Sequence, residues 1–406
     1  MLLASFALLA DAGAQEWTRF RGPNGSGVSD SKSVPVTWTE KDFRWRVPIP
    51  GESHCQPVVS GDKLFLTSAI EQGKERMLLC LNKADGKELW SKKVAMATYA
   101  KHKLNSFASS SPAVDKDRVY AAFVSSEQFL VKAWDHSGKE LWTEDLGAFK
   151  AQHGHGSSPV VFEDRLVLTN DQDGESFIAA LDTKTGKVAW KSARRGGDQM
   201  TAYGTPCILE RKGAPTQVIT SSQTHGLSSL DLKTGAPLWE AKVFDKRAVS
   251  SPVLAGDLVI GTCGQGGGGS CLAAVKIGGN GDVTSSNVAY TIRQVVPYVP
   301  TPVATADRLF WVTDGGVANC AELATGKVLW SERLVDKTIF YGSPVAIDGK
   351  LYIVSQKGDM FVFGASDSFK LLSKNPMGEG SHSTPCVDGD RLYLKTFTHL
   401  VCVGGK

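Results

Sequence analysis

The chain has 406 residues, 42% of them hydrophobic and 21% charged, which is the balance of an ordinary globular protein. Its formal net charge is only +3, and no basic run interleaves with aromatic residues, so a nucleic-acid-binding surface is not expected. After the first residues, no apolar run approaches the ~20 residues that span a bilayer, so no transmembrane segment is predicted.

The first 14 residues have the pattern of an export signal. Leu2 to Ala10 is an apolar stretch, and Ala12-Gly13-Ala14 supplies the small residues that precede a cleavage site. We therefore predict a signal peptide over residues 1–14 and a mature protein in the periplasm or outside the cell. The alternative is a buried N-terminal strand.

A two-residue signature recurs eight times, 41 to 55 residues apart. Ser, Thr or Gln precedes a proline, small apolar residues follow, and most copies continue into a turn and an apolar strand. Proline is tolerated there because it opens its strand, where a missing N–H donor costs least. The eight prolines are Pro57, Pro112, Pro159, Pro206, Pro252, Pro302, Pro344 and Pro385.

A second signature closes many of the repeats. It is clearest from Leu181 to Trp190, where a strand leads into a Gly-containing polar turn and a second strand that ends in tryptophan. We expect this recurring tryptophan to pack between neighbouring repeats. Tyr290 and Leu372 stand in its place in two repeats, so we expect those interfaces to pack differently. The structural tryptophans are Trp45, Trp90, Trp142, Trp190, Trp239 and Trp330.

Four short strands per repeat, here A to D, with a period in the forties are typical of propeller blades. We therefore predict an all-β fold, an eight-bladed β-propeller of four-stranded antiparallel blades. The eighth repeat has no D strand, whereas Phe43 to Val47 looks like a D strand with its tryptophan. This N-terminal strand should close the last blade and remove an open edge. Residues 15–42 then form an N-terminal segment and residues 43–406 a single, monomeric propeller.

The Asp-x-x-Thr-Gly-Lys-x-x-Trp pattern from Asp182 to Trp190 resembles the repeat of pyrroloquinoline-quinone (PQQ) enzymes and of BamB-like proteins. Residues 17–25 look like the start of secreted bacterial proteins with PQQ-like repeats. The resemblance implies the fold more than the function, since the scaffold carries enzymes and non-enzymes. Quinoprotein alcohol dehydrogenases have two adjacent cysteines beside the cofactor, and this sequence has none.

The loops between strands D and A and between B and C should share one face of the propeller, and several polar and aromatic residues fall in them. The candidate cofactor- or ligand-binding residues are His54, His153, His155, Tyr203, His225, Tyr298, Tyr341, Lys357 and His382. Candidate metal ligands are His54, His382, His155 and Asp171, because neutral imidazole is a common ligand. The alternative is that these residues fill the funnel and bond neighbouring loops.

Two of the eight cysteines, Cys263 and Cys271, flank a glycine-rich stretch at the ends of a predicted hairpin. A disulfide between them is plausible in an exported protein, unless the hairpin places the two side chains on opposite faces. The other cysteines fall in apolar strand patterns and should be buried.

No catalytic motif is evident, so the sequence identifies no catalytic residue. The favoured function is a binding or scaffolding propeller that contacts an envelope protein, a small molecule or a glycan through its His/Tyr-rich face. One alternative is a small PQQ-dependent oxidoreductase in which calcium accompanies the quinone. Another is a carbohydrate-binding propeller with tyrosines as stacking platforms. No cofactor is certain.

Overall fold

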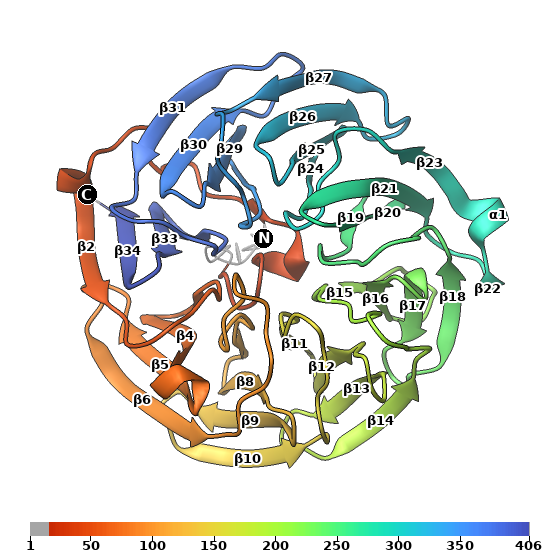
Figure 1. Ribbon diagram of the computed structural model, residues 1–406, viewed down its shortest axis with the longest axis horizontal. Coiled ribbons are helices and arrows are strands. Elements are labelled where there is room, and N and C mark those ends of the chain that lie inside the picture. The colour runs from red at the N-terminus through yellow and green to blue at the C-terminus, as the bar shows by residue number, and fades with distance from the viewer. Residues whose placement is uncertain (1–15, 406) are drawn as a thin grey trace, which may run out of the picture.

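The computed structural model describes residues 16–405 and shows a closed ring of eight four-stranded antiparallel blades (Figure 1). The predicted all-β, eight-bladed propeller is confirmed. The predicted signal peptide, residues 1–14, lies outside the described residues. Within residues 16–405, no helix is long and apolar enough to cross a membrane.

The blades follow one another around the ring, each with its A strand innermost. Blades 1 to 4 contain β3 (Val58–Ser60), β4 (Lys63–Ile70), β5 (Glu75–Asn82) and β6 (Glu88–Ala95); β7 (Ala113–Val114), β8 (Arg118–Val124), β9 (Phe129–Asp135) and β10 (Glu140–Asp145); β11 (Val160–Phe162), β12 (Arg165–Asn170), β13 (Phe177–Asp182) and β14 (Val188–Ala193); β15 (Cys207–Leu209), β16 (Gln217–Ser222), β17 (Gly226–Asp231) and β18 (Pro237–Ala241).

Blades 5 to 8 repeat the pattern. They contain β19 (Val253–Ala255), β20 (Leu258–Gln265), β21 (Gly268–Lys276) and β23 (Val288–Ile292); β24 (Val303–Thr305), β25 (Arg308–Val312), β26 (Val317–Glu322) and β27 (Val328–Arg333); β28 (Val345–Ile347), β29 (Lys350–Val354), β30 (Asp359–Gly364) and β31 (Leu371–Pro376); β32 (Cys386–Asp388), β33 (Arg391–Lys395), β34 (His399–Gly404) and β2 (Phe43–Pro48). The short helices are η1 (Pro23–Gly25), η2 (Glu40–Asp42), η3 (Glu71–Gly73) and α1 (Thr284–Asn287).

The N-terminal strand β2 closes the ring, as predicted. It pairs antiparallel with β34, so that Trp45 lies opposite Cys402 and Val47 opposite Leu400. Blade 8 is thus built from both ends of the chain, and its outer strand does not leave β34 as an open edge.

The residue before each proline explains the first signature. Its side-chain hydroxyl accepts a hydrogen bond from the backbone N–H of the equivalent residue in the preceding blade, at 2.9–3.0 Å. A hydroxyl suits this buried position because its oxygen accepts the bond and it has only one O–H donor to be satisfied, whereas an amide side chain has two N–H donors. The acceptors are Ser111, Ser158, Thr205, Ser251, Thr301, Ser343 and Thr384. Gln56 stands at the eighth position.

The second signature is a docking contact between blades. The indole N–H of a D-strand tryptophan donates to a backbone carbonyl in the next blade, as Trp142 does to Thr183 at 2.9 Å. Its ring packs over the glycine of the next C–D turn, and a Cβ on Gly186 would come within 2.6 Å of the Trp142 ring. Glycine is therefore required there by space as well as by its positive φ. The other donor–acceptor pairs are Trp90 with His136, Trp190 with Leu232, and Trp330 with Ser366.

The expectation that Tyr290 changes its interface is wrong. Its hydroxyl donates to the carbonyl of Leu323 at 2.8 Å, and its ring covers Gly326, so phenol replaces indole in the same contact. After blade 4, the Trp239 indole donates instead to Gln217 of its own blade, although its ring packs with Val259 and Val275 of blade 5. Leu372 in blade 7 has no side-chain donor, so its interface also lacks this hydrogen bond, as expected. In blade 5 the short C–D turn is replaced by β22 (Gly281–Asp282) and α1, and β22 pairs parallel with β18.

The first part of the N-terminal segment, residues 17–27, lies at the centre of the ring, and the chain then runs outward to β2 at the rim (Figure 1). Backbone N–H groups of A strands donate to it, among them Val59 to the Trp17 carbonyl and Ala346 to the Gly27 carbonyl, at 2.9 and 2.8 Å. The Asn24 amide exchanges two bonds with the backbone of Ile208. These contacts come from blades 1, 7 and 4, so the segment ties distant blades together.

Two arginines of this segment are buried at the level of the A-strand prolines. The Arg21 guanidinium, fully buried, donates to the carbonyls of Thr301, Pro302 and Pro344 at 3.3, 2.7 and 3.3 Å. Arg19 donates to Pro206 at 2.5 Å. Burial lowers the pKa of Arg21 to about 9 and that of Arg19 to about 10.

Gln56 joins this segment to the ring. Its side-chain oxygen accepts the Arg21 backbone N–H at 2.5 Å, and its amide nitrogen donates to the carbonyl of Pro385. The glutamine thus replaces Ser or Thr at the one position where blade 8, blade 1 and the N-terminal segment meet.

Candidate functional site at the channel mouth

The face formed by the D–A and B–C loops carries a ring of residues, each three positions before a blade proline. We call these eight residues the mouth ring. All of them are partly exposed, although their neighbours toward the proline are buried. They are His54, Ser109, Gly156, Tyr203, Val249, Val299, Tyr341 and His382. The sequence prediction included four of them.

Aromatic side chains gather on one side of this ring, where blades 7, 8 and 1 meet. The His382 ring centroid lies 4.5 Å from those of both His54 and Tyr341, and 5.1 Å from that of Phe397. We call these four residues the aromatic cluster. Phe397 is 36% exposed, which is unusual for a large apolar side chain. The cluster therefore presents aromatic surface to solvent at the mouth.

The two histidines of the cluster are held neutral. The His382 Nδ1–H can donate to the Leu104 carbonyl at 3.3 Å while Nε2 accepts from the Gln356 amide at 3.1 Å. Burial lowers the pKa of His382 to about 4, and burial together with the nearby His382 lowers that of His54 to about 3. Among the described residues no side chain or carbonyl bonds the His54 ring nitrogens, so this imidazole remains available to a ligand.

Sequence reasoning missed a buried lysine beside this cluster. Lys395 ends β33, is 1% exposed, and donates from Nζ to the carbonyls of Thr396 and Phe397 at 2.6 and 3.0 Å. Burial lowers its pKa to about 8. Its position at the end of the B strand of blade 8, just before the B–C loop on the face of His382, was the signal that could have found it.

The remaining histidines of the D–A loops do not join the cluster. The ring of His153 lies 5.2 Å from that of His102, and the buried His155 packs 5.5 Å from Phe129 and 5.4 Å from Phe149. Burial lowers the pKa of His155 to about 4. His155 therefore resembles a core residue more than a ligand.

The other predicted site residues are dispersed. Tyr298 is buried. Its backbone N–H donates to the Asp314 carboxylate, and its hydroxyl lies 3.5 Å from the Arg247 guanidinium. Lys357 is exposed in the B–C loop of blade 7.

The four candidate metal ligands also do not converge. Asp171 pairs with Arg194 at 3.4 Å, and His155 lies in its own phenylalanine environment. Across residues 16–405, no three His, Cys, Asp or Glu side chains are grouped so that they could hold a metal ion. Only His54 and His382 lie together.

Cys263 and Cys271 lie directly opposite each other across β20 and β21, so the hairpin puts them on the same face. Both are buried free thiols, as are the other six cysteines. The disulfide between them stays a prediction, and their placement on one face is the arrangement that it requires.

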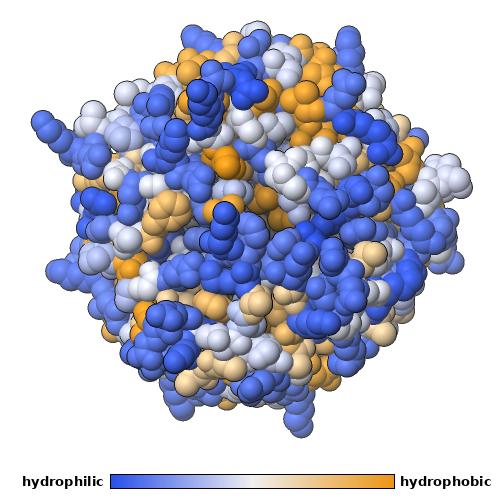
Figure 2. All heavy atoms as spheres, in the orientation of Figure 1, coloured by the Kyte–Doolittle hydropathy of each residue, from blue (hydrophilic) through white to orange (hydrophobic). Residues whose placement is uncertain are grey.

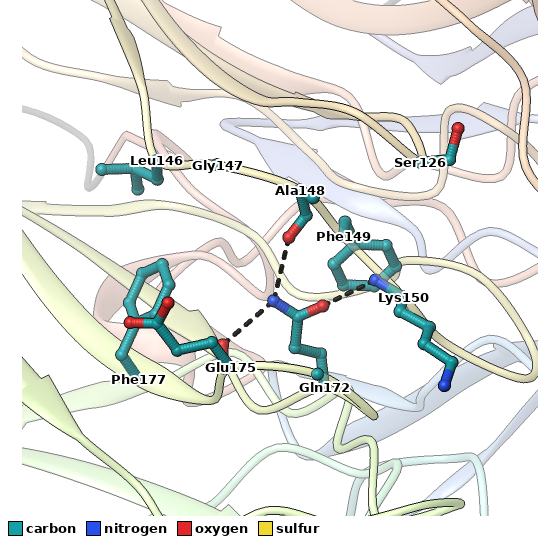
Figure 3. Close-up of a pocket in the computed structure, with 10 residues that line it drawn as sticks. Ser126, Leu146, Gly147, Ala148, Phe149, Lys150, Gln172, Glu175 and Phe177 are labelled. Carbon is teal, nitrogen blue, oxygen red and sulfur yellow. Dashed lines mark hydrogen bonds between the residues drawn. The ribbon is translucent and has the colours of Figure 1, made fainter.

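Two open clefts lie between blades, away from the mouth. The larger, about 500 Å³, separates blades 2 and 3. There the Gln172 amide bridges the carbonyls of Ala148 and Glu175, and its oxygen accepts the Lys150 N–H (Figure 3). The second, about 350 Å³, lies between blades 3 and 4 and contains His225. Figure 2 shows that the face viewed along the propeller axis is mainly hydrophilic, with small apolar areas near its centre.

Comparison with known proteins finds two kinds of relatives. The chain is 21% identical over 387 residues to the outer membrane protein assembly factor BamB of Burkholderia pseudomallei (strain K96243), covering 91% of each chain. It is 27% identical over 260 residues to a polyvinylalcohol dehydrogenase of Pseudomonas sp., covering 53% of this chain but only 39% of that protein. Among solved structures, a europium-containing methanol dehydrogenase has a TM-score of 0.71 at 10% identity, covering 96% of this chain and 98% of that one.

The family described as outer membrane protein assembly factor BamB matches residues 29–131, 74–332 and 280–396, which together span nearly all of the described propeller. These matches agree with the repeat signatures and with the blade-to-blade docking that they produce. The chain therefore belongs to the BamB family of PQQ-like repeat propellers.

Proposed function

We propose that this protein is an exported binding module of the cell envelope and that it contacts a protein partner through the aromatic cluster at the channel mouth. The observation that carries the proposal is the exposed Phe397 beside Tyr341 and two neutral histidines. Aromatic residues are enriched in protein interfaces because they bury a large rigid surface at low entropic cost. BamB relatives, named for outer membrane protein assembly, support a scaffolding role.

The N-terminal segment supports placing the partner contact at the channel mouth. It fills the channel from the level of the A-strand prolines, so an incoming partner meets the mouth ring rather than an open pore. The neutral imidazole of His54 and the Tyr341 hydroxyl can then bond polar groups of a partner without the cost of burying a charge.

Site-specific photocrosslinking in the exporting cell tests the proposal. A crosslinker at Phe397 should give a discrete adduct that weakens when Tyr341→Ala is added. The matched control is a crosslinker at Lys184, an exposed residue of a C–D turn on the opposite face. No adduct from Phe397, or the same adduct from Lys184, would count against the proposal.

The dehydrogenase relatives favour a second candidate, a PQQ-dependent oxidoreductase. The residues at the mouth fit this cofactor in part. Tyr341, His382 and Phe397 supply aromatic surface for a flat quinone, and Arg19, Arg21 and Lys395 are buried cations without a carboxylate partner, which favours an anionic ligand. Calcium fits poorly, because it takes six or more oxygen ligands and the mouth ring contains no carboxylate.

Calorimetric titration with PQQ, with and without calcium, separates the two candidates. The binding-module proposal expects no calcium-dependent binding at micromolar affinity. Tight binding that is lost in His54→Ala and His382→Ala would instead favour the oxidoreductase and place the quinone at the cluster.

A further inference from the structure

The cleft between blades 3 and 4 lies beside two departures from the repeat. The Trp239 ring packs in the core with Val259 and Val275 of blade 5, but its indole N–H bonds to Gln217 within its own blade. The blade 5 C–D turn is replaced by residues of which β22 pairs along the outer side of β18. Asn280, Gly281 and Asp282 from this insertion form one wall of the cleft. At about 350 Å³ it lies at the small end of ligand pockets.

Charged groups line this cleft, and each has a partner of opposite charge. Arg195 lies 2.6 Å from Glu240, and Lys242 lies 3.0 Å from Asp282. Arg194, whose side chain is 5% exposed, pairs with Asp171, itself equally buried, at 3.4 Å. The charges therefore cancel in pairs.

His225 adds a neutral group. Its Nε2 accepts the Arg195 backbone N–H at 3.1 Å, so its Nδ1 carries the proton that it donates to Glu240 at 2.7 Å. Burial lowers its pKa to about 4. The imidazole is thus uncharged at neutral pH, and it fixes the orientation of the carboxylate.

Hydroxyls and apolar surface complete the lining. The Ser228 side chain faces the cleft, where Arg194 Nη2 donates to it at 3.1 Å. Ser229 also lines the cleft, but its hydroxyl donates to Gln217 on the opposite face of β17. The Arg194 side chain is almost fully buried and bonds through Nε to Asp171 and through Nη2 to Thr220, Ser222 and Ser228. Pro237 and Leu238 add apolar surface beside these groups.

We propose that this cleft binds a neutral sugar, one or two rings in size. A charged ligand would have to break an existing ion pair to form its own, so it gains little. A sugar hydroxyl both donates and accepts, so it can add to the remaining lone pairs of Glu240 and to the N–H groups of the exposed Arg195 without breaking their pair. Pro237 and Leu238 suit the apolar C–H face of the ring.

The test is calorimetric titration of the full protein with maltose, cellobiose and diacetylchitobiose, and with glutamate as a zwitterionic probe. At least one neutral disaccharide should bind, and Glu240→Gln and Arg195→Gln should each weaken it by about tenfold or more. Arg195 is 54% exposed, so its replacement leaves the fold intact.

The matched control is Glu175→Gln, which removes a carboxylate paired with Lys191 at the neighbouring cleft between blades 2 and 3. This variant should bind the sugar as the native protein does. The proposal is overturned if no disaccharide binds, if binding survives both cleft substitutions, or if glutamate binds and the sugars do not. None of these outcomes bears on the channel mouth, which is a separate surface.

Discussion

Replacing Arg21 by methionine tests whether the N-terminal segment holds the ring together. The substitution keeps the length of the side chain but removes its bonds to Thr301, Pro302 and Pro344, and leaves those buried carbonyls without a donor. Each charged hydrogen bond contributes about 1.5–3 kcal/mol. The substitution also removes a buried charge that has no carboxylate partner, and so removes its desolvation cost, which offsets part of that sum. We therefore expect a net destabilisation of about 3 kcal/mol.

This loss converts into a measurable change in Tm. At about 2.1 cal/mol/K per residue, unfolding a chain of this size carries an entropy of about 0.8 kcal/mol/K, so 3 kcal/mol lowers Tm by about 4 °C. Differential scanning calorimetry measures it. The control is Arg333→Met on an exposed strand, where a surface pair with Asp336 and an exposed bond to the Gly315 carbonyl are lost and the change should stay within about 1 kcal/mol. Equal shifts for the two variants would refute the reasoning.

Three further predictions concern the blade contacts and the mouth. Ser158→Ala leaves the Ser111 N–H unbonded and should cost about 1–3 kcal/mol by urea unfolding, whereas Ser137→Ala in an exposed turn should change little. Tyr290→Phe should cost about 1 kcal/mol because the Leu323 carbonyl loses its donor, and Tyr290→Trp should recover part of it; an unchanged Tyr290→Phe would contradict the docking role. His54 and His382 have folded pKa values below the unfolded 6.5, so their contribution is complete above about pH 6.5 and declines toward pH 4. Lowering the pH from 6.5 to 5.0 should reduce the free energy of unfolding by about 2 kcal/mol for each of the two histidines. In the double variant His54→Gln/His382→Gln, the urea midpoint should depend less on pH over this range.

The sequence predicted most of the ring because the repeat itself carries the contacts that build it. Each Ser/Thr-Pro pair marks an A strand and its hydroxyl acceptor, and each Gly-x-x-x-Trp marks a docking contact. The adjacency of His54 and His382 followed from closure of blade 8 by β2, and their rings are 4.5 Å apart. These inferences needed only the period of the repeat and the alternation of strand direction.

The features that the sequence did not predict depend on contacts between segments far apart in the chain. Arg21 reaches carbonyls some 280 and 323 residues away, and no local pattern predicts that distance. Tyr290 was expected to change its interface because the repeat pattern has tryptophan at this position. Phenol and indole, however, both place a hydrogen-bond donor over the next turn. His225 shares the B–C loop face with His54, but its side chain turns outward to Glu240.

The departures from the repeat are therefore more informative about function than the repeat. Gln56 breaks the hydroxyl ring, and the structure explains it through the N-terminal segment alone. Trp239 breaks the docking series only in its hydrogen bond: the indole N–H bonds within its own blade, the ring still packs with Val259 and Val275 of blade 5, and an insertion forms one wall of a polar cleft. Tyr290 keeps the bond to the next blade with a different donor, whereas Trp239 does not. The cleft between blades 3 and 4 therefore lies where the chain departs from the contacts that build the ring, which supports its proposal as a binding site.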